Sequence, residues 1–232
     1  MKYIDKTKLQ APASYESELI AAQLDETSIA GGAHAGRSGK DLFKNEVKKL
    51  PSYRTMKHQL LEDQGYVCCY CNRRITGIKD PTEHVKPKSV YRELVGEYKN
   101  LLASCTGGNP IPAPYTRLTY PPHCDNNKAN QELPISPLST DCEWRFQYDP
   151  VTGEVKGDAD VQTAVTCLNL NHPVLKTERQ QEIATWCYDN NGNILNEEQL
   201  GKVFFKMLTR EADGRFHNLY YIIASAALSL VG

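Results

Sequence analysis

The sequence predicts an α+β fold, in which a small cysteine-rich core of short strands is surrounded by helices from the N-terminal and C-terminal parts of the chain. Three of the eight cysteines fall within four residues, in the segment CCYC that begins at Cys68. Prolines around residues 81–87 favour extended backbone, because the residue before a proline disfavours helix. Apolar residues with helical spacing lie before residue 64 and again from residue 161 onward.

The chain of 232 residues divides by its character into three parts. Residues 1–39 form an N-terminal segment and linker, residues 40–135 a core with preceding basic helices, and residues 136–232 a hairpin followed by a helical region. Hydrophobic residues at 40% and charged residues at 24% are typical of a soluble globular protein. This composition allows a core of useful size without disulfides.

No membrane or secretory segment is predicted. The first ten residues contain no apolar stretch of the kind that a signal peptide needs. The longest apolar run, residues 219–231, is shorter than the ~20 residues that cross a bilayer. We therefore expect a soluble cytoplasmic protein, in which eight cysteines indicate metal binding or burial rather than disulfides.

Positive charge is concentrated in residues 37–60, although the net charge of the whole chain is −1. This stretch holds seven basic residues against two acidic ones: Arg37, Lys40, Lys44, Lys48, Lys49, Arg54 and Lys57 against Asp41 and Glu46. Such a face can bind phosphate groups, or it can be an ordinary solvated surface.

The expected elements follow in order. Residues 15–24 are predicted to form a short helix, residues 28–39 a loop of small residues, and residues 40–64 a helix broken at Pro51, with Ser52 capping its second part. The central elements are a cysteine-bearing turn at 66–75, extended segments at 82–85 and 101–105, short helices at 89–97 and 125–131, and a Pro/Gly-rich insertion at 106–123. A hairpin at 144–156 precedes helices at 161–170, 173–187, 196–210 and 216–230.

Four cysteines have the arrangement of a structural zinc site. Cys68 and Cys71 form a C-x-x-C pair, and Cys105 and Cys124 are the natural second pair. Eighteen residues separate the second pair, which leaves ligand positions unchanged only if the ends of the insertion stay close together. Cys69 or His123 can replace one of the four, and buried free thiols are the alternative interpretation. The remaining cysteines, Cys142, Cys167 and Cys187, lack partners at ligand spacing and are expected in the core.

Glu83 and His84 are adjacent on an extended segment, so their side chains leave it on opposite faces. Glu83 can then bind a hard cation while His84 faces a substrate. Asp125 follows Cys124 directly and would be brought close if the cysteine site forms. A neutral imidazole can accept a proton from water near pH 7, and a cation can stabilise charge on a phosphate. Three nearby lysines, Lys86, Lys88 and Lys128, are candidates for phosphate binding or ordinary surface residues.

These motifs resemble those of HNH nucleases, which have a ββα-metal fold. More narrowly, CCYC, EHVKPKS, YKNLLASC, HCDNNKAN and CLNLN resemble the PtuB-type HNH proteins of Septu and retron-associated antiphage systems. The resemblance covers roughly residues 40–180 and is most specific in residues 68–130. It implies a phosphodiester hydrolase that works with a PtuA-type ATPase, and in some systems with a retron reverse transcriptase and its msDNA.

The resemblance also implies roles for individual residues. His84 would be the general base, Asn100 would brace the loop that orients it, and Glu83 with Asp125 would bind the catalytic Mg²⁺ or Mn²⁺. Glu83 stands where Asp is commoner, and Asp125 where Asn or His is commoner. Asn126 or Asn127 can take over the role of Asp125 if the helix register shifts. The four cysteines, Cys68, Cys71, Cys105 and Cys124, would bind the structural Zn²⁺.

Two functions are compatible with the sequence. The first is a metal-dependent endonuclease that cuts DNA or RNA, as the effector of an antiphage defence complex. The second is a zinc-ribbon adapter that binds a partner or nucleic acid without cleaving it, which the near-neutral net charge favours.

Overall fold

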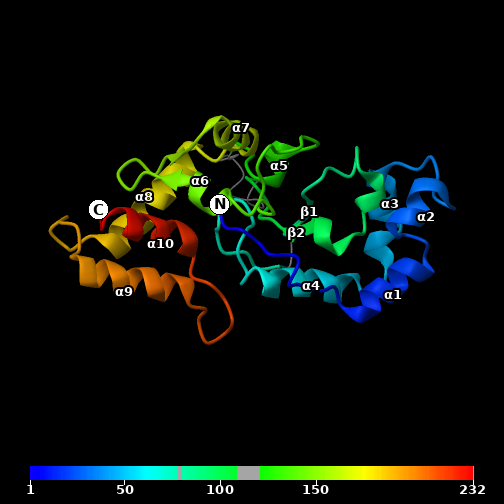
Figure 1. Cartoon of the computed structure of the whole chain (residues 1–232), viewed down its shortest axis with the longest axis horizontal. Helices are drawn as coiled ribbons and strands as arrows, with labels where there is room; N and C mark the ends of the chain where they lie inside the picture. Colours follow the sequence, from blue (N-terminus) through cyan, green and yellow to red (C-terminus); the bar gives the residue numbers. More distant parts are fainter. Residues whose placement is uncertain (78–79, 109–120, 232) are drawn as a thin grey trace, which may run out of the picture.

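The computed structural model describes residues 1–77, 80–108 and 121–231. The molecule is elongated (Figure 1). Helices from the N-terminal part lie at one end, the C-terminal helices lie at the other, and a small sheet with a short helix lies between them. Short strands and many helices make this an α+β protein, as the sequence predicts.

The N-terminal part consists of α1 (Ala13–Ala21), α2 (Glu26–Gly31), α3 (Gly39–Asn45), the 3-10 turn η1 (Val47–Lys49) and α4 (Tyr53–Asp63). The expected break at Pro51 is confirmed. Helix α2 lies where a loop was expected, because Asp25 caps it by accepting a hydrogen bond from the backbone N–H of Ser28 and because Ile29 is buried. The expected capping of α4 by Ser52 is wrong: its hydroxyl donates to Glu18 on α1 instead, at 2.6 Å.

The central part contains β1 (Thr82–His84), the 3-10 turns η2 (Arg92–Leu94) and η3 (Tyr98–Asn100), β2 (Leu101–Ala103) and α5 (Asp125–Lys128). The two strands pair antiparallel, with Glu83 opposite Leu102. Both strands are buried on both faces, so Glu83 and His84 lie in the interior. The expected helix at 89–97 is reduced to the turn η2, and residues 109–120 of the expected insertion lie outside the described residues.

The C-terminal part begins with α6 (Cys142–Arg145) and the predicted hairpin of β3 (Gln147–Tyr148) and β4 (Val155–Lys156). The four predicted helices follow as α7 (Ala159–Leu168), α8 (Pro173–Cys187), α9 (Glu197–Leu208) and α10 (Tyr220–Ser229). Helix α9 starts with a capping box between Asn196 and Gln199. Helix α10 packs against α8 and α9 and buries six of its ten residues, so most of the apolar tail lies in the protein's own core.

One hydrophobic cluster joins the three parts, from Met1 through the strands to Ala227. Because the three parts share this core, the structure does not separate them into independent units. The division at residues 39 and 135 stays a prediction from the sequence. In the described part of the chain, no helix is long and apolar enough to cross a membrane.

Candidate functional site

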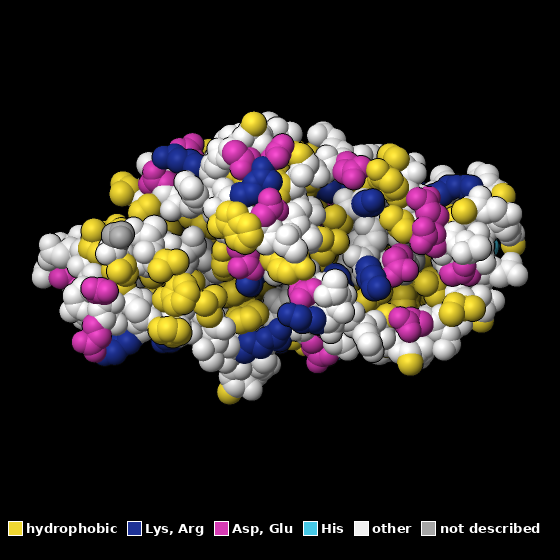
Figure 2. All heavy atoms as spheres, viewed as in Figure 1, with side chains coloured by type: hydrophobic (Ala, Val, Ile, Leu, Met, Phe, Trp, Pro, Cys, Tyr) yellow, Lys and Arg dark blue, Asp and Glu magenta, His cyan; other side chains and the backbone are white. Residues whose placement is uncertain are grey.

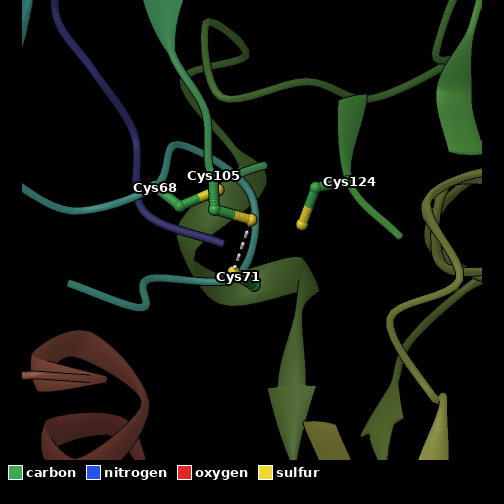
Figure 3. A group of neighbouring side chains, drawn as sticks. All are labelled: Cys68, Cys71, Cys105 and Cys124. Carbon is green, nitrogen blue, oxygen red and sulfur yellow. Dashed lines mark hydrogen bonds between the residues drawn. The ribbon is translucent and has the colours of Figure 1, made fainter. Parts of the chain in front are cut away.

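Four buried cysteines, Cys68, Cys71, Cys105 and Cys124, form a compact group (Figure 3). Their sulfur atoms all lie within 4.8 Å of one another, and the sulfurs of Cys71 and Cys105 are 3.8 Å apart. Four thiolates placed tetrahedrally at about 2.3 Å from a zinc ion would have sulfurs roughly 3.8 Å apart. The group therefore fits a structural Zn²⁺, which is the arrangement expected from the sequence.

Cys68 and Cys71, the first half-site of the group, lie on a tight turn. The backbone N–H of Cys68 donates to Arg73 O at 2.9 Å, and that of Asn72 donates to Cys68 O at 3.1 Å. Asn72 has a positive φ of 59°, which asparagine tolerates better than most residues. A bridge between Val67 and Arg74 closes the turn. This geometry directs Cys68 and Cys71 to the same side.

The C-terminal part of the chain braces this turn. Leu219 N donates to Asn72 O at 3.0 Å, and Arg74 N donates to the side chain of Asn218 at 2.9 Å. Phe216 N donates to Gly65 O just before the turn, at 2.9 Å. The first half-site is thus held by residues far away in the sequence.

Cys105 and Cys124, the second half-site, can meet only if the two ends of the insertion between them lie close together. His123 N donates to Gly107 O at 3.1 Å, so the chain on either side of the insertion is held together. Cys124 adopts a positive φ of 54°, which turns its sulfur towards the other three. The condition set by the long spacing of Cys105 and Cys124 is therefore met.

The two alternative ligands lie outside the four-sulfur group. His123 places its Nδ1 3.2 Å from the sulfur of Cys124 and 3.9 Å from that of Cys105. Cys69 is buried beside the group, and its backbone N–H donates to Ala103 O on β2. Both residues therefore lie beside the group, whose members among the described residues are the four cysteines.

Glu83 and Asp125 lie side by side next to this group. Asp125 begins α5 directly after Cys124, and Glu83 projects from β1. Burial first, and then the neighbouring Glu83, raise the pKa of Asp125 to about 8. Burial opposes ionisation of Glu83, but hydrogen bonding with Asp125 and the charge of Lys128 hold its pKa below the usual value. Two carboxyl groups in contact supply oxygen ligands of the kind that hard cations prefer.

His84 projects from the other face of β1 and is 2% exposed. Its Nε2 lies 3.0 Å from the carbonyl oxygen of Val95, and its ring packs edge-on against Phe43 with centroids 4.5 Å apart. Nε2 must carry a proton to donate to that carbonyl, which leaves Nδ1 as an unprotonated acceptor. Nδ1 is buried and has no hydrogen-bond partner among the described residues. Burial and the charge of Lys88 lower the pKa of His84 to about 4, so the ring is neutral at pH 7.

Asn100 ties both ends of the segment between β1 and η2. Its Oδ1 accepts from the backbone N–H of Lys86 at 2.8 Å. Its Nδ2 donates to Lys86 O at 3.1 Å and to Leu94 O at 3.3 Å. Because Leu94 precedes Val95, whose carbonyl holds His84, Asn100 fixes the backbone that orients the imidazole.

The three lysines predicted to bind phosphate occupy different positions. Lys128 is 1% exposed; its ammonium lies 2.7 Å from Glu83 Oε1 and donates to His84 O at 3.0 Å. Lys88 is half-buried and its charge acts on both carboxyl groups. Lys86 is exposed, with its ammonium 4.9 Å from the centre of the Tyr91 ring. Lys128 thus acts mainly on Glu83, whereas Lys88 has the larger effect of the two lysines on the pKa of Asp125.

Sequence reasoning missed three residues of this site. Tyr70 lies between the first two cysteines and donates its hydroxyl to Glu83 at 2.7 Å. Phe43 supports the ring of His84. Gly39, assigned to a linker, begins α3 against the backbone of Lys88, where an added Cβ would lie 1.8 Å from the carbonyl oxygen. The position of Tyr70 between two ligands was a usable signal, whereas the other two contacts depend on tertiary packing.

The chain belongs to the HNH endonuclease family. The assignment rests on a relative from Vibrio cholerae serotype O1 biovar El Tor, which is named "Retron Vc95 putative HNH endonuclease". The two sequences are 30% identical over 171 residues, which cover 69% of this chain and 76% of the relative. No protein-family model matches the chain.

Proposed function

We propose that the protein is a metal-dependent endonuclease that hydrolyses phosphodiester bonds of DNA or RNA. In this proposal β1, β2 and α5 form the ββα-metal core, and residues 40–135 are the nuclease unit. The observation that carries the proposal is the buried Nδ1 of His84, which has no partner among the described residues and lies on the strand that bears Glu83. A buried acceptor without a donor destabilises the fold, and a catalytic role would explain why it is kept.

Glu83 and Asp125 would bind the catalytic Mg²⁺ or Mn²⁺. The adjoining carboxyl groups supply hard oxygen ligands, and Tyr70 and Lys128 orient Glu83 by two contacts of 2.7 Å. A cation held there would stabilise negative charge on the phosphate and on the leaving oxygen. Lys88, and Lys86 at the rim, would contact the substrate phosphates, whereas the buried Lys128 would act through Glu83.

His84 would accept a proton from the attacking water at Nδ1. The hydrogen bond from Nε2 to Val95 O fixes the tautomer that leaves this atom free, and edge-on packing against Phe43 fixes the ring plane. Asn100 would act as a positioning residue, because it holds the backbone next to Val95. General-base catalysis of this kind contributes typically 10²–10⁴ in rate.

The biological role that we propose is the effector nuclease of an antiphage defence complex in the cytoplasm. The name of the relative supports a retron setting. We propose a PtuA-type ATPase as the partner, together with a retron reverse transcriptase and its msDNA. An apolar cleft of about 890 Å³ between the β3–β4 hairpin and helices α9 and α10 supports a protein partner. Figure 2 shows hydrophobic side chains over α9 and α10, and Trp144 at the cleft is 68% exposed.

The direct test is a cleavage assay with the purified zinc-loaded protein, alone and with its co-expressed partner. We expect nicking of a plasmid or cutting of RNA that requires added Mg²⁺ or Mn²⁺. Binding of nucleic acid without cleavage under all these conditions would instead support the zinc-ribbon adapter, and binding would then be unaffected by Glu83→Ala.

Replacing Asn100 by alanine is expected to lower both stability and cleavage. The change leaves the N–H and carbonyl of Lys86 and the carbonyl of Leu94 without their partner, which costs about 2–3 kcal/mol. Urea unfolding and cleavage rates measure the two effects. Asn45→Ala, which removes a single hydrogen bond to Asp41 on α3, is the control and should change stability by less than ~1 kcal/mol. An Asn100→Ala protein with full activity would remove the bracing role.

Gly39→Ala is expected to disturb the segment that carries Lys88. The new methyl group would overlap the backbone of Lys88, so α3 or this segment must move, at a cost of roughly 1–3 kcal/mol. Gly31→Ala in α2 is the matched control, because a Cβ there meets no atom within 4 Å. We expect lower cleavage and a lower melting temperature for Gly39→Ala alone. Equal behaviour of the two variants would show that the contact does not support the site.

A further inference from the structure

A basic groove lies beside α4, and none of the candidate site residues lines it. It has a volume of about 660 Å³ and contains five basic side chains: Lys48, Arg54, Lys57, His58 and Arg215. No aspartate or glutamate of the described residues lines it. The chain as a whole has a net charge of −1, so this groove is a local concentration of positive charge.

The charges in the groove are largely uncompensated. His58 lies 3.6 Å from Glu62, and Arg215 lies 3.5 Å from Asp213. Within the described ranges, Lys48, Arg54 and Lys57 form no ion pair. Arg37, from the same basic stretch, differs because its guanidinium contacts Asp41 at 2.7 Å and Glu46 at 2.8 Å. The structure thus separates basic residues that serve the fold from those that are free to bind an anion.

Two contacts link the groove to the candidate catalytic centre. The ammonium groups of Lys48 and Lys88 lie 5.0 and 5.6 Å from the centre of the Phe43 ring, and that ring packs on His84. The hydroxyl of Tyr53, which lines the groove, is 2.8 Å from the hydroxyl of Thr82, the residue before Glu83. Positive charge therefore extends from the carboxylate pair through Lys88 and Lys48 into the groove.

We propose that this groove binds the sugar-phosphate backbone of the nucleic acid strand whose scissile phosphate lies at Glu83, Asp125 and His84. The inference rests on the proposed nuclease function and adds the path of its substrate. The ligand chemistry is a row of phosphodiesters, which DNA and RNA share. The guanidinium of Arg215 already covers the ring of Tyr66, at 4.8 Å, so contacts to phosphates rather than stacking on bases are expected to dominate.

The test compares two triple variants of the full-length, zinc-loaded protein. The groove variant carries Lys48→Ala, Arg54→Ala and Lys57→Ala. The control carries Lys40→Ala, Lys44→Ala and Lys49→Ala, which remove the same charge from three exposed lysines of the same stretch that do not line the groove. Fluorescence anisotropy measures binding of labelled single-stranded DNA, duplex DNA and single-stranded RNA without added divalent cation, over a range of salt concentrations. Circular dichroism and zinc content check that each variant is folded.

We expect the groove variant to bind at least about tenfold more weakly, with a dependence of log K on log salt that is shallower by about 2 to 3. The control is expected to retain the affinity of the natural protein within roughly twofold, because its lysines lie outside the path. The arm with the largest loss identifies the type of strand that the groove accepts.

Equal affinities of the two triple variants would overturn the proposal, and so would a groove variant that cleaves as fast as the natural protein. A parallel Mg²⁺ assay separates this inference from the nuclease function. If the natural protein binds through the groove but never cleaves, the endonuclease proposal fails while the binding site stands. If it cleaves and both triple variants cleave equally well, only the groove proposal fails.

Discussion

Replacing Cys71 by serine is expected to abolish stoichiometric zinc binding and to unfold the central part of the protein under conditions where the natural protein is folded. The serine hydroxyl is a poor ligand for zinc, and three thiolates cannot complete the tetrahedral shell. Binding of structural zinc is worth about 10–16 kcal/mol in small zinc domains, so losing much of it exceeds the 5–15 kcal/mol by which most domains are stable. Zinc measured by mass spectrometry and thermal unfolding by circular dichroism record the two effects.

Cys187→Ala is the control for this experiment. Cys187 is equally buried, but it lies on α8 and is not one of the four grouped cysteines. It should retain one zinc ion per chain and lose only about 1 kcal/mol of stability. A Cys71→Ser protein that keeps both its zinc and its melting temperature would contradict the four-cysteine site.

Replacing His84 by alanine is expected to lower the cleavage rate by about 10²–10⁴ without changing zinc content or the affinity for nucleic acid. The variant lacks the Nδ1 that would accept the proton from water, while Glu83 and the cysteine group are retained. Because His84 is buried, the substitution also leaves a cavity beside Phe43, so activity is compared below the melting temperature of the variant. Added imidazole can enter such a cavity, and partial rescue of cleavage would identify a lost base.

Two further variants sharpen this prediction. His84→Gln fills more of the cavity than alanine but offers no comparable base, so it should be more stable than His84→Ala and equally inactive. His34→Ala removes a histidine from the N-terminal part, where its Nε2 lies 3.1 Å from Ala22 O, and should leave cleavage unchanged. Full activity of His84→Gln would exclude His84 from the chemistry.

The four cysteines that group in the structure could be picked out from the sequence, because zinc restricts the side chains that bind it. The C-x-x-C at Cys68 and the adjacent Glu83 and His84 are local patterns, and the α+β class followed from helical spacing on both sides of them. The closeness of Cys105 to Cys124 follows from no local pattern, since it depends on the hydrogen bond between Gly107 and His123.

Other features could not be predicted because they arise from packing between distant segments. The burial of Lys128 under Glu83 is hidden in a sequence where lysine normally indicates surface. The carbonyl of Val95 carries no side-chain signal, yet it sets the tautomer of His84. Arg215 joins a groove formed mainly by residues 48–77, although more than 130 residues separate it from them. Helix α2 was missed because its small residues favoured a loop.

Hydrogen bonds between residues 216–219 and residues 65–74 connect the C-terminal helices directly to the four-cysteine group. Leu219 directly precedes α10, and its backbone N–H holds Asn72, one residue after Cys71. A molecule that grips α9 and α10 and shifts them has to stretch this connection or carry the turn along with it. In the proposed nuclease, a partner bound at α9 and α10 would then regulate cutting through a displacement transmitted by these hydrogen bonds, without an additional domain.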